Sequence, residues 1–201
     1  MIALIDYGAG NLTSVKKALA SLGAEFTVPG TPAQCQGMSG LIVPGVGHFS
    51  ATTALGAPWR EAIGRVVDAG TPLLGICVGM QWLYQGSEEA PDVPGLGVLS
   101  GRVRLLHGDA SQRLKIPHVG WNALELPRHS RLLAGVDAGA HVYFTHSYAA
   151  PVTTDCVAST THAERFAAAV ESGHVFGVQF HPEKSGDAGL QILRNFLAVC
   201  R

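Results

Sequence analysis

Two short, uninterrupted apolar runs, "GLIV" at 40–43 and "PLLGI" at 72–76, constrain the fold of this chain most strongly. A strand that is covered on both faces is apolar throughout, whereas a half-exposed strand alternates with polar residues. Between the two runs lies 58–70, which has a proline in its first turn and a glycine at its end, as helices do. Strand, helix and strand in this order predict parallel pairing beneath helices.

The rest of the chain extends this pattern and then changes it. In the first half, a short apolar run at 2–6, a helical pattern at 11–23 and a strand-like segment at 25–28 continue the alternation. In the second half, turn residues separate strand-like segments at short intervals, as in antiparallel sheets; these are 97–106, 118–126, 141–148, 155–161, 166–172 and 175–180, followed by a closing helix at 186–200. We expect one α/β domain over 1–201, with a mainly parallel central sheet, flanking helices and an antiparallel extension.

Charge and cysteine usage exclude several classes of protein. The net charge of −1 offers no electrostatic footprint for nucleic acid or an anionic membrane. The four cysteines form no Cys-x-x-Cys pair, so neither a zinc site nor a thioredoxin-type motif is indicated. The first residues do not resemble a signal peptide, and no apolar run is long enough to span a bilayer. We therefore expect a cytoplasmic protein.

The stretch "GICVGMQ" at 75–81 places Cys77 between two glycines, where a buried strand ends and a helix begins. Gly-x-Cys-x-Gly is the thiol form of the nucleophile elbow, a strained turn that displays its nucleophile at the carboxyl end of the sheet. Glycines are expected on both sides because side chains there would clash. The helix N-terminus favours the thiolate and directs the Val78 N–H at a reacting carbonyl. A packed structural cysteine is the alternative, and it would be preferred without partner residues.

The segment "GVQFHPEK" at 177–184 supplies such partners. His181 follows an apolar strand, and Glu183 lies two residues later, across Pro182. We expect the proline to exclude helix, so that in an extended segment Glu183 points the same way as His181 and orients its ring. A surface histidine and glutamate are the alternative. An elbow cysteine at another strand end favours the catalytic interpretation.

The loop "PGVGHF" at 44–49 follows the buried strand 40–43. Its glycines let backbone N–H groups approach a small substrate closely, as an oxyanion hole requires. The alternative is an ordinary Gly/Pro turn. We favour the oxyanion loop because the strand before it belongs to the same predicted sheet.

These three segments together resemble the class I (triad) glutamine amidotransferase family, whose fold is flavodoxin-like. The resemblance runs from residue 2 to the final helix. In detail, the chain is similar to the glutaminase subunits of imidazole glycerol phosphate synthase. The segments that carry it are "DYGAGNLTSV" (6–15), "PGVGHF" (44–49), "GICVGMQ" (75–81), "PHVGWN" (117–122), "YFTHSY" (143–148) and "GVQFHPEKSGDAGL" (177–190). Most relatives outside this group carry a "GGPG"-type loop in place of "PGVG". Val78 stands where the group usually has Leu, but only its N–H is needed.

The resemblance implies a role for each matching residue. Cys77 would be the nucleophile, His181 the acid and base, and Glu183 the group that orients His181. The oxyanion would be bound by the backbone of Gly45, Val46, Gly47 and Val78, and the two ends of glutamine by Gln81, His146, Ser147 and Tyr148. No metal or organic cofactor is implied.

The implied reaction is hydrolysis of L-glutamine to glutamate and ammonia through a Cys77 thioester. The ammonia would pass to a (β/α)8-barrel cyclase subunit in a heterodimer, which makes imidazole glycerol phosphate and aminoimidazole carboxamide ribotide in histidine biosynthesis. Asn11, Trp121, Asn122 and Lys184 would lie at the interface. Alternatively, Asn11 caps a helix, Trp121 belongs to the core and Lys184 is solvated.

Three other classes of function compete with this one. A glutaminase could serve another synthase, such as those for anthranilate, aminodeoxychorismate or pyridoxal phosphate, but "PGVG" and "PHVGWN" argue against it. Related cysteine peptidases and deglycases place the histidine close to the cysteine in sequence, and a non-catalytic subunit would not need an intact triad.

Cys35, Cys156 and Cys200 are expected to be buried, apolar residues. We also expect the free chain to be a poor glutaminase, because the "PGVG" loop can present a carbonyl instead of an N–H.

Overall fold

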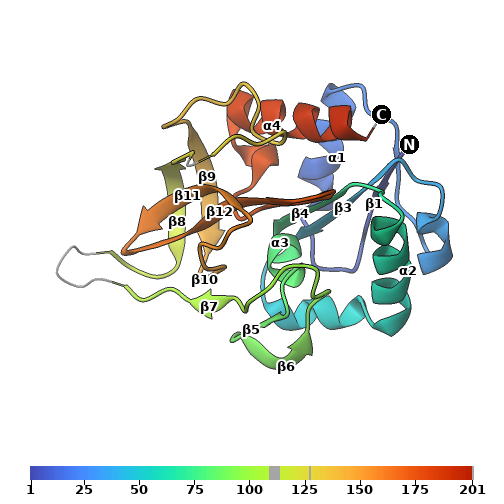
Figure 1. Cartoon of the computed structure of the whole chain (residues 1–201), viewed down its shortest axis with the longest axis horizontal. Coiled ribbons are helices and arrows are strands. Elements are labelled where there is room, and N and C mark those ends of the chain that lie inside the picture. Colours follow the sequence, from blue (N-terminus) through green and yellow to red (C-terminus); the bar gives the residue numbers. More distant parts are fainter. Residues whose placement is uncertain (109–113, 127, 201) are drawn as a thin grey trace.

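The computed structural model describes residues 1–108, 114–126 and 128–200. A seven-stranded sheet runs through the molecule (Figure 1). Its strands lie in the order β11 (Cys156–His162), β12 (Glu164–Ser172), β13 (Val175–Val178), β4 (Leu73–Cys77), β3 (Gly40–Gly45), β1 (Ile2–Leu4) and β2 (Phe26–Thr27).

The sheet is mainly parallel, as the two apolar runs predict. In the part of the sheet that contains β13, β4, β3, β1 and β2, each strand pairs in parallel with its neighbour. At one edge, β12 pairs antiparallel with both β13 and β11. In the register of the sheet, Gly45 of β3 lies opposite Cys77 of β4, and Val178 of β13 lies opposite Ile76. Three strands from distant parts of the sequence therefore end side by side at one edge.

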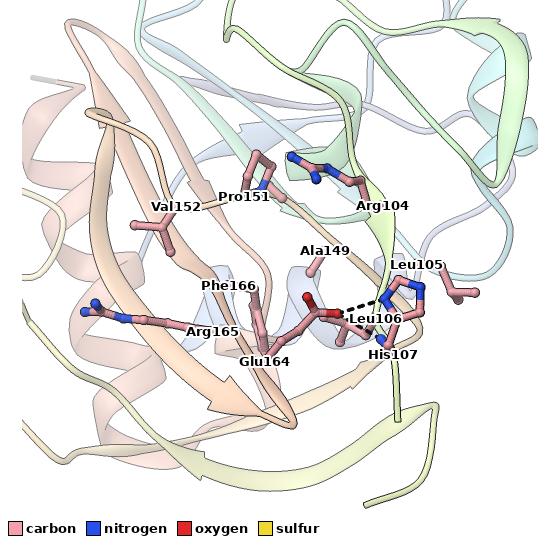
Figure 2. A pocket seen from close by; sticks show the side chains of 11 residues that line it. Arg104, Leu105, Leu106, His107, Ala149, Pro151, Val152, Glu164, Arg165 and Phe166 are labelled. Carbon is pink, nitrogen blue, oxygen red and sulfur yellow. Dashed lines mark hydrogen bonds and ion pairs between the residues drawn. The ribbon is translucent and has the colours of Figure 1, made fainter. Parts of the chain in front are cut away.

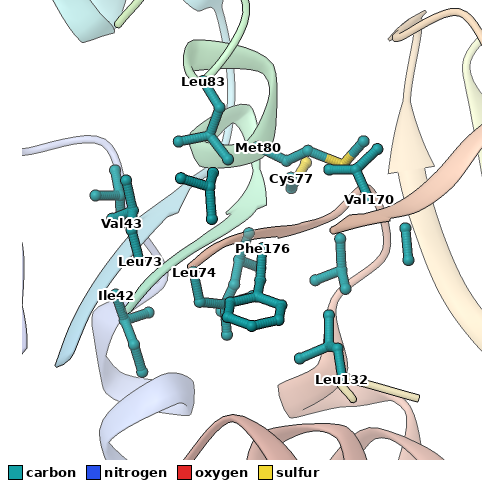
Figure 3. Close-up of a cluster of buried hydrophobic side chains, with 14 of the residues drawn as sticks. Ile42, Val43, Leu73, Leu74, Cys77, Met80, Leu83, Leu132, Val170 and Phe176 are labelled. Atoms are coloured by element: carbon teal, nitrogen blue, oxygen red, sulfur yellow. The ribbon is translucent and has the colours of Figure 1, made fainter. Parts of the chain in front are cut away.

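Helices cover both faces of the sheet (Figure 1). They are α1 (Leu12–Ser21) and α4 (Gly186–Val199) on one face, and α2 (Ala57–Asp68) and α3 (Val78–Trp82) on the other. The core is made of aliphatic and aromatic side chains of β3, β4 and β13 between these layers, and Cys77 lies at its border beside Met80 (Figure 3). None of the helices in the described ranges is both long and apolar enough to cross a membrane.

The remaining strands form small antiparallel pairs outside the main sheet. They are β5 (Gly86–Ser87) with β6 (Ala90–Pro94), β7 (Arg104–Leu105) with β10 (Tyr148–Ala149), and β8 (His118–Ala123) with β9 (His141–His146). The antiparallel part of the main sheet is therefore shorter than the sequence suggests. The β5–β6 pair and the 3₁₀ helices Pro32–Cys35, Phe49–Ala54 and Pro182–Lys184 were not predicted.

Two predicted strands differ from the structure. Most of residues 97–106 is irregular, because Gly97 and Gly101 adopt φ angles of 77° and 102°, which are incompatible with an extended strand. Residues 141–148 were expected to form one strand, but the strand breaks at Ser147 between β9 and β10. The carbonyl of Ser147 accepts the N–H of Leu106, so β10 turns away to pair with β7.

Helix α3 crosses closely over β3 because Gly79 has no side chain. A Cβ atom at Gly79 would overlap the carbonyl oxygen of Val43. The first turn of α3 can therefore lie directly against the sheet only if this position is glycine.

We predict that Gly79→Ala destabilises the fold by about 3 kcal/mol, because backbone atoms of β3 must move to admit the methyl group. Gly64 in α2 is the matched control, since nothing lies within 4 Å of the Cβ it would gain. Gly64→Ala should stabilise the protein by about 0.5–1 kcal/mol through helix propensity. Urea unfolding of both variants measures the two effects, and a Gly79→Ala protein as stable as the wild type would contradict the packing described.

Candidate active site

Cys77 occupies a strained turn between β4 and α3. Its backbone has φ 54° and ψ −111°, a combination that is rare for a residue with a side chain. A Cβ at Gly75 would lie 2.6 Å from the carbonyl oxygen of Gly79, so the two flanking glycines are required by the close packing of the turn. The strained backbone and the clearance predicted for a nucleophile elbow are both present. Because α3 begins at Val78, the Val78 N–H has no acceptor within the helix.

His181 and Glu183 meet beside this turn. The imidazole Nδ1 lies 2.8 Å from Glu183 Oε1, and both side chains are only 1% exposed. The contact was predicted, but the predicted extended geometry is wrong. Residues Pro182–Lys184 form a 3₁₀ helix with proline at its start, and His181 is extended just before it. Proline is well tolerated in the first turn of a helix, where its missing N–H would have no acceptor.

The buried histidine is held in its charged form. Burial alone would lower the pKa of His181, but the Cys77 sulfur and the Glu183 carboxylate outweigh it and raise the pKa to about 9. The Nε2 atom is buried and has no hydrogen-bond partner among the described residues. The arrangement is that of an imidazolium oriented by a carboxylate on Nδ1, with Nε2 available to a reacting group.

The loop after β3 contains a second expected element, but one of its donors is occupied. The Val46 N–H donates to the carbonyl of Ala9 at 2.7 Å. It is therefore not free to bind an oxyanion in this conformation. Gly47 follows with φ 86°, so the loop turns in a conformation that side chains disfavour. Among the expected oxyanion donors, the Val78 N–H belongs to the elbow and has no acceptor within helix α3.

A small pocket of about 30 Å³ opens beside the sulfur. All four predicted glutamine contacts line it, and the lining residues are Gly47, Cys77, Val78, Gln81, Glu89, Thr145, His146, Ser147 and Tyr148. A volume of this size holds little more than a water molecule. In this conformation the enclosed part of the pocket is therefore smaller than an amino acid.

Three residues of this site, Glu89, Thr145 and Gln179, were missed by the sequence analysis. Glu89 lines the pocket, and its Oε2 accepts the N–H of Phe49 at 2.7 Å. It lies between β5 and β6, which the sequence pattern did not predict, so nothing indicated it. Gln179 donates from Nε2 to the Cys77 sulfur at 3.7 Å and is fully buried. A polar residue inside the apolar run 175–180 was the available signal.

The two predicted interface residues on β8, Trp121 and Asn122, point to opposite faces of the strand, and Lys184 lies on the same side as Trp121. Trp121 is 56% exposed, which excludes the core alternative, and it packs edge-on against Tyr143 at a ring distance of 6.1 Å. Lys184 is exposed and places its Nζ 5.7 Å from the centre of the same Tyr143 ring. Asn122 points to the opposite face, where its amide contacts His118 and the carbonyl of Thr161. Its amide is thus engaged inside the molecule.

Asn11 occupies the N-cap position of α1, but its side chain makes no capping hydrogen bond to the backbone. The amide nitrogen instead donates to Ser14 Oγ at 2.9 Å. The alternative of a helix cap is therefore confirmed in position, but without a side-chain capping bond. Neither this contact nor its half-buried position assigns a role to Asn11.

A larger hollow of about 230 Å³ lies elsewhere, between β7, β10 and β12 (Figure 2). Its charged groups do not converge on a common point. Glu164 pairs with His107 in the figure, while Arg165 extends away and pairs with Glu125. The hollow shares no lining residue with the pocket at Cys77. Within the described ranges, no group of three or more His, Cys, Asp or Glu residues could hold a metal ion.

Comparison with known families and curated proteins gives one consistent result. The family model described as glutamine amidotransferase class-I matches residues 3–200. The chain is 47% identical over 209 residues to the imidazole glycerol phosphate synthase subunit HisH of Geobacillus kaustophilus, covering 99% of this chain and 97% of that one. It is 43% identical over 204 residues to the subunit of the same name from Methanothermobacter thermautotrophicus, covering all of both chains.

Solved structures agree on the fold. A crystal structure of a glutamine amidotransferase superposes with a TM-score of 0.77 at 22% identity, covering 100% of this chain and 99% of that one. The PurLQS structure from Thermotoga maritima gives a TM-score of 0.75 at 20% identity, covering 100% of this chain and 98% of the other. At these identities the likeness concerns the fold alone.

The charge on His181 yields a test of the site. The pKa of about 9 in the folded protein exceeds the ordinary 6.5, so protonated His181 contributes stability that is complete below pH 6.5 and is lost as the pH rises through 9. Glu183→Gln removes part of this contribution. We expect it to lower the free energy of unfolding by about 1–2 kcal/mol at about pH 6, with a smaller difference at about pH 9.5.

Urea unfolding at the two pH values measures this difference. Glu61→Gln is the matched control, because Glu61 is exposed on α2. It should change stability little at either pH. An effect of Glu183→Gln that is equal at both pH values would show that the carboxylate does not act through His181.

Proposed function

The chain belongs to the class-I glutamine amidotransferase family, and on that premise we propose that Cys77, His181 and Glu183 are its catalytic triad. The function is that of the glutaminase subunit of an imidazole glycerol phosphate synthase, which hydrolyses glutamine for histidine biosynthesis. The similarity to curated subunits of this synthase over almost the whole chain supports it. The observation that carries the proposal is the common edge at which β3, β4 and β13 end, since it collects all three motifs. We assign 1–201 to one glutamine amidotransferase domain.

The chemistry follows from the positions of these groups. The Cys77 sulfur attacks the side-chain amide carbon of glutamine, and the Val78 N–H binds the oxyanion that forms. His181 gives its Nε2 proton to the leaving nitrogen, which departs as ammonia and leaves a γ-glutamyl thioester. A water molecule then gives one proton to His181 and attacks the thioester, so that glutamate is released and the sulfur is restored. Glu183 holds the imidazole in one orientation throughout.

The glutamine would be held by the residues that line the pocket. The amide nitrogen of Gln81 donates to the carbonyl of Tyr148 and to Gln179 Oε1. Its carbonyl oxygen is therefore available to the substrate. The Glu89 carboxylate suits the α-ammonium group, and the backbone around Ser147 borders the same space. Gln179 donates a hydrogen bond to the sulfur and thereby helps to position it.

We propose that the ammonia passes to a cyclase subunit with a (β/α)8-barrel fold, bound as a heterodimer. Its docking surface would be the outer face of the β8–β9 pair, with Val119, Trp121 and Tyr143, together with Lys184 of the adjoining 3₁₀ helix. Val119 and Trp121 are more than half exposed, which is unusual for large apolar side chains on one face. The face adjoins the triad, because the His181 N–H donates to the carbonyl of Tyr143. Asn11 is a further interface candidate.

We assign the protein to the cytoplasm. All four cysteines are free and buried, and this fits a reducing compartment. The reaction itself also needs Cys77 as a thiol or thiolate.

Cys77→Ala tests the division of labour between the subunits. We expect the variant complex to lose glutamine-dependent synthesis while it keeps nearly all ammonia-dependent synthesis, because only ammonia production needs the sulfur. Both rates are measured on the complex with the barrel subunit and its ribonucleotide substrate. Loss of both activities in a folded, assembled complex would contradict the proposed roles.

The hydrogen bond from Val46 to Ala9 generates a second prediction. While this bond persists, the loop offers no Val46 N–H to the oxyanion, so the isolated chain should hydrolyse glutamine poorly. A missing oxyanion donor typically costs about 10²–10³ in kcat. Glutamine turnover is measured with and without the barrel subunit and its ligand. Equal turnover in the two conditions would refute the prediction.

A further inference from the structure

A chain of hydrogen bonds connects the inner face of β8 to the segment that lines the glutamine pocket. Asn122 Nδ2 lies 3.3 Å from His118 Nε2, and His118 Nδ1 lies 3.2 Å from His146 Nε2. His146 Nδ1 lies 2.9 Å from the carbonyl oxygen of Tyr148. The two imidazoles are nearly inaccessible to solvent, with exposures of 3% and 7%.

The direction of this chain is set by the backbone at its two ends. At one end, Asn122 Nδ2 also faces the carbonyl of Thr161, and its Oδ1 accepts the N–H of Ala123, so the amide orientation is fixed. At the other end, the Tyr148 carbonyl can only accept. His146 must therefore carry its proton on Nδ1 and accept on Nε2.

The same logic fixes His118. Its Nδ1 must donate to His146 Nε2, and its Nε2 accepts from Asn122. Any other neutral tautomer would place two donors or two acceptors against each other inside the protein, which is costly. Burial lowers the pKa of His118 to about 4 and that of His146 to about 3, so both rings are neutral near pH 7.

Beyond Tyr148, the hydrogen bonds continue to the nucleophile. The carbonyl that accepts from His146 also accepts from Gln81 Nε2 at 2.9 Å. Gln81 Nε2 contacts Gln179 Oε1 at 3.1 Å, and Gln179 Nε2 donates to the Cys77 sulfur. The Tyr148 carbonyl is thus held from two sides, at the point where the chain passes from β9 to β10 along the pocket.

We propose that His118 and His146 are positioning residues for the glutaminase reaction: with both protons on Nδ1, they hold the Tyr148 carbonyl and thereby the segment that binds glutamine. This replaces the expected substrate contact of the His146 side chain, because both of its ring nitrogens already have partners. It also gives Asn122 an internal role as the donor that starts the chain. The kinetic part of the inference rests on the proposed function, whereas the tautomers do not.

The tautomers are tested by ¹⁵N NMR of the histidine rings in the full-length chain at about pH 7. We expect His118 and His146 to show a protonated Nδ1 and an unprotonated Nε2. His162 is an internal control, because it stacks on His118 but its Nε2 faces the carbonyl of Lys115 and must be the protonated nitrogen. Leucine variants of each histidine assign the signals. A proton on Nε2 of His118 or His146 would overturn the proposal.

The positioning role is tested by paired variants of His146 in the complex with the barrel subunit. His146→Leu removes the donor to Tyr148, and we expect the KM for glutamine to rise about five- to tenfold while kcat changes less than about twofold. His146→Asn places an amide N–H where Nδ1 was, and it should keep KM within about twofold of wild type. A general loss of structure would affect both variants alike, so equal effects would overturn the role.

Two further variants complete the comparison. His118→Leu should raise KM in the same direction as His146→Leu, since it leaves His146 Nε2 without its donor. His162→Leu removes the stacking partner without touching the chain, so KM should stay within about twofold. Unchanged KM in His118→Leu and His146→Leu would exclude the positioning role. A wild-type complex without glutaminase activity would refute the proposed function. The tautomers of His118 and His146 would still be tested by the NMR measurement, which does not depend on activity.

Discussion

The parallel pairing of β3, β4 and β13 in one register is the constraint on which the whole site depends. Gly45 lies opposite Cys77, and Val178 lies opposite Ile76, so the three strands end together. The loop after β3, the elbow and the His-Pro-Glu turn follow these strand ends. A shift of one residue in either pair would turn the side chains of that strand to the other face and separate the three groups.

Close packing at the elbow enforces the same arrangement from the side of α3. Gly75 and Gly79 leave no room for a Cβ, so the backbone of the turn lies directly on the neighbouring strand. The strained conformation of Cys77 persists because the surrounding core over-determines it. Burial then makes the electrostatics strong: the carboxylate and sulfur next to His181 outweigh the cost of a buried charge and raise its pKa to about 9.

Both proposals place a role on the β8–β9 pair, because its residues alternate between two faces. Trp121 faces outward on the surface that we assign to the partner, and Asn122 faces inward on the histidines. A docked subunit that displaced this strand pair would therefore also displace His118 and His146, which hold the Tyr148 carbonyl. The two functions share one short strand, and they differ only in the direction in which successive side chains point.

The sequence by itself determined the parallel sheet, the positions of most helices and strands, and the three motifs at strand ends. Apolar runs, glycine flanks and residue spacing report on local burial and turn geometry, and these are local properties. Only the tertiary structure decided that Glu183 reaches His181 through a 3₁₀ turn, that Glu89 and Gln179 border the sulfur, and that Val46 is bonded to Ala9. It also decided that Asn122 and His146 are turned inward. These contacts join residues that are distant in sequence or depend on which face of a strand is buried, and no local pattern encodes them.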